Sequence, residues 1–123
     1  MCDRHNKNYY KKYKKWCDEY FYIPHRKEAR GIGGIFFDYK KANFEKDFKF
    51  VRDTGVTFQM LFNKIIRKKI RKKWTIKDKE TQYIKRGRYA EFNLLYDRGT
   101  KFGLQTGGNV EGILMSLPPL AKW

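Results

Sequence analysis

Cysteine, proline and histidine are scarce in this chain, and each shortage excludes a class of protein. The 123 residues include 2 cysteines, 3 prolines and 2 histidines. Cys2 and Cys17 are too few for a fold built on disulfides, and their scarcity fits a reduced intracellular chain. With His5 and His25 as the only histidines, a metal site made entirely of protein ligands is improbable.

Long apolar runs are missing as well. The amino terminus MCDRHNKNYY lacks the apolar core of a signal peptide. No segment approaches the roughly 18 apolar residues that a membrane span requires. We therefore expect a soluble, cytoplasmic protein without a membrane span.

Positive charge is the strongest feature that is present. The chain has 29 Lys and Arg against 13 Asp and Glu, which gives a formal net charge of +16. Such a charge attracts anions over a distance, so the expected partner is nucleic acid, acidic lipid or a small polycarboxylate. Aromatic residues make up 18% of the chain, enough apolar surface for one modest folded domain.

Apolar periodicity predicts helices in the first two thirds of the chain. One helix is expected over Asn8–Tyr22, because Pro24 blocks its continuation. Two more are expected within Asn43–Lys73, separated by a break at Asp53–Gly55. A further short helix is expected near Lys77–Lys85.

The remaining segments favour extended structure. Strands are predicted over Gly31–Phe37 and Tyr89–Tyr96, and Asp97–Gly99 has the composition of a turn. Beyond Gly99 we favour extended structure over helix. The predicted class is α+β, with an antiparallel β-sheet flanked by helices.

Three groups of residues could carry chemistry, and the first surrounds the run GIGGIFF. It contains His25, Arg26, Glu28, Arg30 and Asp38. The guanidinium groups could grip carboxylates in bidentate fashion while Asp38 accepts a proton or a hydrogen bond. Alternatively, Arg26 and Glu28 form a structural ion pair and His25 is only a turn residue.

The second group combines Arg98 with the run Gly107, Gly108 and Asn109. Glycines let backbone N–H groups approach an anion and form a nest, to which Arg98 adds charge. A hairpin made only for folding would look much the same.

The third group is the basic run IIRKKIRKKW, which ends at Trp74. It could neutralise phosphates while Trp74 stacks on a base. A lysine-rich helix that simply faces water explains the same run, and no known nucleic-acid module matches.

Two long stretches resemble one enzyme family. KKWCDEYFYIPHRKEARGIGGIFFD, which ends at Asp38, resembles the hallmark segment of oxygen-dependent coproporphyrinogen III oxidase, and RGRYAEFNLLYDRGTKFGLQTGGNVEGILMSLPPLAKW is similar to the C-terminal core of that family. The resemblance implies that residues 1–123 are the C-terminal portion of a single oxidase domain whose upstream half is absent. It also implies a broad antiparallel sheet sandwiched by helices, and a homodimer.

The activity implied by the resemblance belongs to haem biosynthesis. Two propionates of coproporphyrinogen III are oxidatively decarboxylated to vinyl groups, with O2 as oxidant and no organic cofactor, to give protoporphyrinogen IX. The alternatives are a basic nucleic-acid-binding protein or an inactive truncated remnant. Nucleic acid is the less favoured partner, because it leaves both glycine-rich loops unexplained.

The resemblance also implies residue roles. Asp38 and Arg30 are expected to be catalytic, with Asp38 hydrogen-bonding the pyrrole N–H groups. His25 matches a position sometimes assigned to a divalent metal, although a structural role ranks first. Substrate binding is expected at Gly33, Gly34, Arg98, Gly107, Gly108 and Asn109. The dimer interface is expected at Tyr89, Phe92, Ile113, Leu114, Met115 and Leu117.

Overall fold

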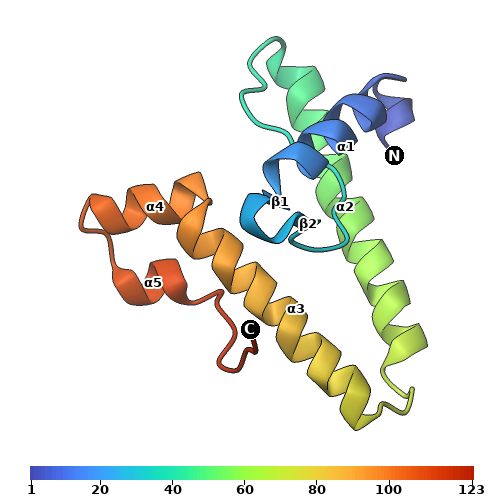
Figure 1. Ribbon diagram of the computed structural model, residues 1–123. Coiled ribbons are helices and arrows are strands. Elements are labelled where there is room, and N and C mark those ends of the chain that lie inside the picture. Colours follow the sequence, from blue (N-terminus) through green and yellow to red (C-terminus); the bar gives the residue numbers. More distant parts are fainter. The chain divides into compact units, whose positions relative to one another are not determined.

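The computed structural model describes all 123 residues, which form two compact units. Unit 1 comprises Met1–Cys17 and Gly34–Lys73, and unit 2 comprises Asp18–Gly33 and Trp74–Trp123. The elements are, in chain order, η1 (Cys2–Arg4), α1 (Tyr9–Tyr20), β1 (Tyr22–Ile23), η2 (Pro24–Arg26), β2 (Glu28–Ala29), α2 (Phe44–Lys69), α3 (Ile76–Leu95), α4 (Arg98–Gln105) and α5 (Val110–Leu114) (Figure 1).

Aromatic side chains build the core of unit 1. Phe50 of α2 is fully buried, and its ring meets those of Tyr9 and Phe37 edge-on, each at 4.9 Å between centroids. Cys2 and Tyr13 complete the buried cluster. Edge-to-face packing of this kind favours a defined arrangement of rings, so a small unit obtains an ordered core from few residues.

The segment after Asn43 forms one helix of 26 residues, α2, so the predicted break at Asp53–Gly55 is wrong. The polar side chains there are satisfied without leaving the helix. Thr54 donates its hydroxyl to the Phe50 carbonyl oxygen at 2.8 Å, and Asp53 binds the His5 ring at 2.9 Å. The single Gly55 costs only about 1 kcal/mol relative to alanine, which is too little to end a long helix.

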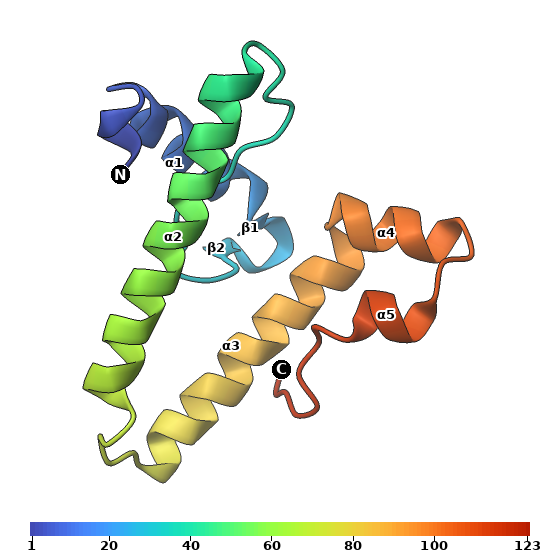
Figure 2. The same cartoon turned by 180° about the vertical axis from the view of Figure 1, so that it is seen from behind.

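Unit 2 is built on a short hairpin and α3. In the hairpin, β1 and β2 pair antiparallel with Tyr22 opposite Ala29 and Ile23 opposite Glu28. Thr75 and Asp78 form a capping box at the start of α3. Further along, α4 and α5 lie side by side in both views (Figures 1 and 2).

The α+β class with an antiparallel sheet is confirmed, as are the first helix and the turn at His25 and Arg26. The sheet is nevertheless limited to two strands of two residues each. The predicted strand over Gly31–Phe37 is wrong, since the run has no regular structure. The predicted strand over Tyr89–Tyr96 is also wrong, since α3 extends through Leu95.

The extended structure expected beyond Gly99 is replaced by α4 and α5. Both helices have side-chain caps that composition alone did not reveal: Asp97 accepts from the Thr100 N–H at 2.7 Å and Asn109 from the Gly112 N–H at 3.3 Å. Such caps satisfy N–H groups that a helix start leaves free. None of the helices has the length and apolar character needed to cross a bilayer.

Candidate functional site

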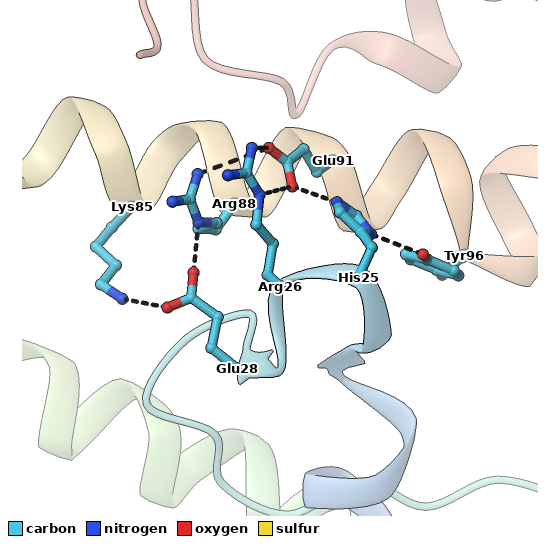
Figure 3. A network of polar contacts seen from close by, with 7 residues as sticks. All are labelled: His25, Arg26, Glu28, Lys85, Arg88, Glu91 and Tyr96. Atoms are coloured by element: carbon cyan, nitrogen blue, oxygen red, sulfur yellow. Dashed lines mark hydrogen bonds and ion pairs between the residues drawn. The ribbon is translucent and has the colours of Figure 1, made fainter. Parts of the chain in front are cut away.

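A network of charged side chains joins the hairpin of unit 2 to one face of α3 (Figure 3). The chain reverses at Lys27, whose φ of 53° is left-handed, so neighbouring side chains can project toward α3. The members of the network are His25, Arg26 and Glu28 from the hairpin, and Lys85, Arg88, Glu91 and Tyr96 from α3 and the residue directly after it.

Glu91 is the centre of the network. Its side chain is buried, and Arg26 donates to both carboxylate oxygens, from Nε at 3.0 Å and from Nη2 at 2.5 Å. The His25 Nε2 lies 2.9 Å from the same carboxylate. Hydrogen bonding by Arg26 lowers the pKa of Glu91, burial opposes the shift, and the bond to His25 adds to it. The carboxylate is therefore held ionised by the hairpin.

His25 connects this carboxylate to a phenol. Its Nδ1 lies 2.7 Å from the Tyr96 hydroxyl, and the two rings stack with centroids 5.7 Å apart. Both ring nitrogens are thus engaged, and a metal would have to displace one of these contacts. The structure has no group of three His, Cys, Asp or Glu side chains that could hold a metal ion. A metal role for His25 stays a prediction.

Glu28 pairs with α3 rather than with Arg26, its partner in the alternative hypothesis from the sequence. The Nε of Arg88 donates to its carboxylate, and the Lys85 Nζ lies 3.5 Å from it. The bond from Arg88 lowers the pKa of Glu28, against the effect of burial. Arg88 also lies 3.6 Å from the Glu91 carboxylate, so both acids belong to one connected network that fixes the hairpin on α3.

Arg30 lies against three aromatic rings. Its guanidinium carbon is 4.2 Å from the ring centroid of Phe21, 5.0 Å from that of Tyr89 and 5.3 Å from that of Phe92. These are cation–π distances, and partial desolvation strengthens such contacts. The guanidinium, expected to be catalytic, is thus positioned by packing.

The second predicted group lies at the two ends of α4. Arg98 begins this helix, and its guanidinium carbon lies 5.1 Å from the ring centroid of Tyr20. Gly107 has a φ of 72° that suits glycine, and the Gly108 N–H donates to the Gly103 carbonyl at 2.9 Å. The loop ends α4 and leads to Asn109, the cap of α5.

Asp38 lies in unit 1, as does Gly34. Its loop is anchored on both sides, because Phe37 packs on Phe50 and Lys40 pairs with Asp47 at 2.9 Å. The other predicted site residues, namely His25, Arg30, Gly33, Arg98, Gly107, Gly108 and Asn109, belong to unit 2. The roles expected for all of them stay predictions.

The residues predicted to form a dimer interface differ in exposure. Met115 is 83% exposed, whereas Phe92 is only 1% exposed and packs against Phe21 at 5.3 Å between ring centroids. Ile113, Leu114, Leu117 and Tyr89 are half-buried. Phe92 could therefore serve an interface only by supporting the surface from below.

Sequence reasoning missed Glu91, Arg88, Lys85 and Tyr96. Glu91 and Tyr96 fall on opposite faces if Tyr89–Tyr96 is a strand, and Lys85 and Arg88 lie outside it. In a helix, the spacings from Lys85 to Arg88 and from Arg88 to Glu91 put these three residues on one face. The capping box Thr75–Asp78 could have located the start of α3, but it gives no signal for the continuation of the helix to Leu95.

Comparison with known proteins supports the resemblance over the whole chain. A family model described as coproporphyrinogen III oxidase matches residues 1–123. The chain is 60% identical over 123 residues to the oxygen-dependent coproporphyrinogen-III oxidase of Rickettsia bellii (strain OSU 85-389), which covers 99% of this chain and 44% of that protein. It is 60% identical over 124 residues to the protein of the same name from Rickettsia rickettsii (strain Sheila Smith), covering 100% and 44%. The chain thus spans less than half the length of these curated relatives.

Proposed function

Because the chain belongs to the coproporphyrinogen III oxidase family, we propose that it takes part in the oxidative decarboxylation of coproporphyrinogen III to protoporphyrinogen IX. The observation that carries this proposal is the 60% identity, which extends over 99% of the chain. It favours an enzyme of porphyrin biosynthesis over a nucleic-acid-binding protein.

The proposed reaction converts two propionates to vinyl groups. For each of them, R–CH2–CH2–COOH and O2 give R–CH=CH2, CO2 and H2O2, so O2 receives both electrons and no organic cofactor is needed. The substrate carries several carboxylates, and the +16 charge of the chain would attract it over a distance.

Carboxylate binding is assigned to the two ends of α4. Arg98 begins the helix, and Gly107, Gly108 and Asn109 follow its end. A helix of eight residues is about 12 Å long at 1.5 Å per residue, so one macrocycle would meet both ends through different propionates. Arg98 would supply a bidentate guanidinium, and the glycine loop would supply backbone N–H groups other than that of Gly108, which donates to the Gly103 carbonyl.

The macrocycle itself is assigned to Asp38, Arg30, Gly33 and Gly34. The carboxylate of Asp38 would accept hydrogen bonds from pyrrole N–H groups and help to remove a proton, which makes the ring more electron-rich toward O2. Gly33 and Gly34 carry no side chain and would let a flat ring approach the backbone. Arg30 would supply positive charge from its aromatic surroundings.

We further propose that the protein works as a homodimer in the cytoplasm. The exposed Met115, together with Ile113, Leu114, Leu117, Tyr89 and the underlying Phe92, would form the interface. The exposure of Met115, 83%, supports an apolar contact there.

The proposal is tested by turnover. The purified chain is incubated in air with coproporphyrinogen III, alone and with a separately expressed polypeptide corresponding to the unmatched part of the R. bellii oxidase, and porphyrins are separated by chromatography. We expect O2-dependent protoporphyrinogen IX in the mixture. Absence of product in both samples, while the whole R. bellii enzyme is active, would contradict the proposal.

A further inference from the structure

A hollow of about 370 Å³ lies between α3 and the C-terminal segment, within unit 2. Four side chains of α3 line one wall, and their spacing of three and four residues puts them on one helical face. The lining residues are Lys79, Gln82, Tyr83 and Arg86 from α3, and Ser116, Leu117, Pro118, Pro119 and Leu120 from the C-terminal segment.

Specific contacts hold the two walls together. The Lys122 N–H donates to the Tyr83 carbonyl at 3.0 Å, and the Lys122 Nζ donates to both carboxylate oxygens of Glu80 at 2.7 Å. A Cβ at Gly87 would collide with the Lys122 carbonyl oxygen, so the segment can lie this close only because residue 87 is glycine. At the other end, the Ser116 side chain lowers the pKa of the Tyr89 hydroxyl.

The charge inside the hollow is positive and not balanced by any acid. Lys79 donates to the neutral Gln82 side chain at 2.8 Å and lies 4.9 Å from the Tyr83 ring centroid. Arg86 is exposed and makes no side-chain hydrogen bond or ion pair. The neighbouring acids of α3 are engaged elsewhere: Asp78 is part of the capping box with Thr75, Glu80 is paired with Lys122, and Glu91 is bound by Arg26. Two cations therefore face a wall of leucine and proline.

We propose that this hollow binds a dicarboxylic acid with an apolar body. Lys79 and Arg86 are seven residues apart, which is about 10 Å along a helix, so a ligand with an acid at each end could meet both. The Arg86 guanidinium suits bidentate contact with a carboxylate. The apolar body would pack on Leu117, Pro118 and the Tyr83 ring. Removal of this apolar surface from water would favour binding.

Two kinds of compound have this chemistry: propionate-bearing tetrapyrroles and linear dicarboxylic acids. The tetrapyrrole case rests on the proposed function, whereas the linear acid does not. Isothermal titration calorimetry with coproporphyrin III and with decanedioate separates them. Inorganic phosphate tests whether charge alone suffices, because it lacks an apolar body.

The double variant Lys79→Gln/Arg86→Gln tests the assignment. We expect saturable binding of at least one dicarboxylate by the unaltered chain, and an affinity about tenfold or more lower in the variant, because charge-assisted contacts are lost. The control Lys68→Gln/Arg71→Gln removes the same charge from unit 1 and should change affinity less than about twofold, apart from screening effects.

Gly87→Ala provides a second test that leaves the cations in place. Alanine favours helix more than glycine, so α3 should remain folded by circular dichroism while the C-terminal segment is displaced and binding is lost. Equal loss in the unit 1 control, binding of phosphate as tight as that of the dicarboxylates, or no dicarboxylate binding would each overturn the inference. If Lys79→Gln/Arg86→Gln and Gly87→Ala both keep full affinity while turnover is observed, the assignment of binding to this hollow fails and the proposed function stands.

Discussion

At the residue scale, Glu91 does most to hold the hairpin of unit 2 on α3. It receives two bonds from Arg26 and one contact from His25. We expect Glu91→Gln to lower the free energy of unfolding by about 2 kcal/mol, since bonds to charged groups are worth about 1.5–3 kcal/mol. Urea denaturation measures the change. Glu111→Gln removes an exposed carboxylate as the matched control, and an equal loss in both variants would contradict the role of Glu91.

The same carboxylates predict loss of stability in acid. Arg26 lowers the pKa of Glu91, and Arg88 lowers that of Glu28, each from an ordinary value of 4.5. A lowered folded-state pKa means that the stabilisation is complete above the ordinary value and is lost as pH falls through the folded-state values. Denaturation between about pH 6 and about pH 3 should show this decline, and Glu91→Gln should make it shallower. If stability declines with falling pH as steeply in Glu91→Gln as in the unaltered chain, Glu91 does not cause the loss of stability in acid.

The turn that carries His25 and Arg26 could be predicted from the sequence. Pro24 and the polar residues after it indicated a turn at His25 and Arg26, and η2 forms there. The partners of His25 and Arg26 could not be predicted, because Glu91 and Tyr96 face the hairpin only if the segment before Tyr96 is helical. The aromatic rings around Arg30 come from sequence-distant residues, and no local pattern indicates such a set.

At the element scale, two glycines in helices make opposite predictions. A Cβ at Gly55 of α2 would have no neighbour within 4 Å, whereas one at Gly87 of α3 would collide with the C-terminal segment. Gly55→Ala should therefore raise stability by about 1 kcal/mol, the difference in helix propensity, while Gly87→Ala should not. Chemical denaturation of both variants checks this. A stabilisation at residue 87 as large as that at residue 55 would refute the packing described for α3.

Helices were predictable where apolar residues recur with helical period, as in α1. The first half of α3 was predicted as the short helix near Lys77–Lys85, but its continuation to Leu95 and the helices α4 and α5 were not, because glycines and β-forming residues favoured strands there. Side-chain caps at Thr75, Asp97 and Asn109 start helices there, and each cap satisfies N–H groups at a helix start. Local hydrogen bonding therefore outweighs residue propensity in this half of the chain.

At the scale of the whole molecule, α2 exposes many large apolar side chains. Phe58 and Phe62 are 68% and 52% exposed, and further members of this surface are Phe44, Phe48, Leu61, Ile65 and Ile70. Exposed apolar patches favour association. Acids in the first turn of α2 and cations in its last turn would meet in an antiparallel pair of copies, so we expect self-association that rises with concentration.

Light scattering after size exclusion tests this expectation. Phe58→Lys/Phe62→Lys should shift the chain toward the monomer, and Gln59→Lys/Asn63→Lys adds the same charge to other exposed positions of α2 as control. Met115→Lys reports separately on the predicted interface near α5. Monomers at every concentration in the unaltered chain would contradict association through α2.

The family could be predicted from the sequence, because its two matching stretches are long and occur in order. The joint arrangement of the expected site residues could not, because Asp38 belongs to unit 1 and Arg30, Arg98 and Asn109 to unit 2. The resemblance to the family assigns roles to individual residues but gives no distances between them. The structure adds the local anchors, such as the Lys40–Asp47 ion pair in the loop of Asp38 and the aromatic rings around Arg30.

The most direct test of the proposed function is turnover by a chimera in which this chain replaces the matching 44% of the R. bellii oxidase. We predict O2-dependent conversion of coproporphyrinogen III to protoporphyrinogen IX, with kcat about a hundredfold lower for Asp38→Asn, as expected for loss of a general base. A folded chimera that forms no product while the R. bellii enzyme is active, or one in which Asp38→Asn has no effect, would contradict the account.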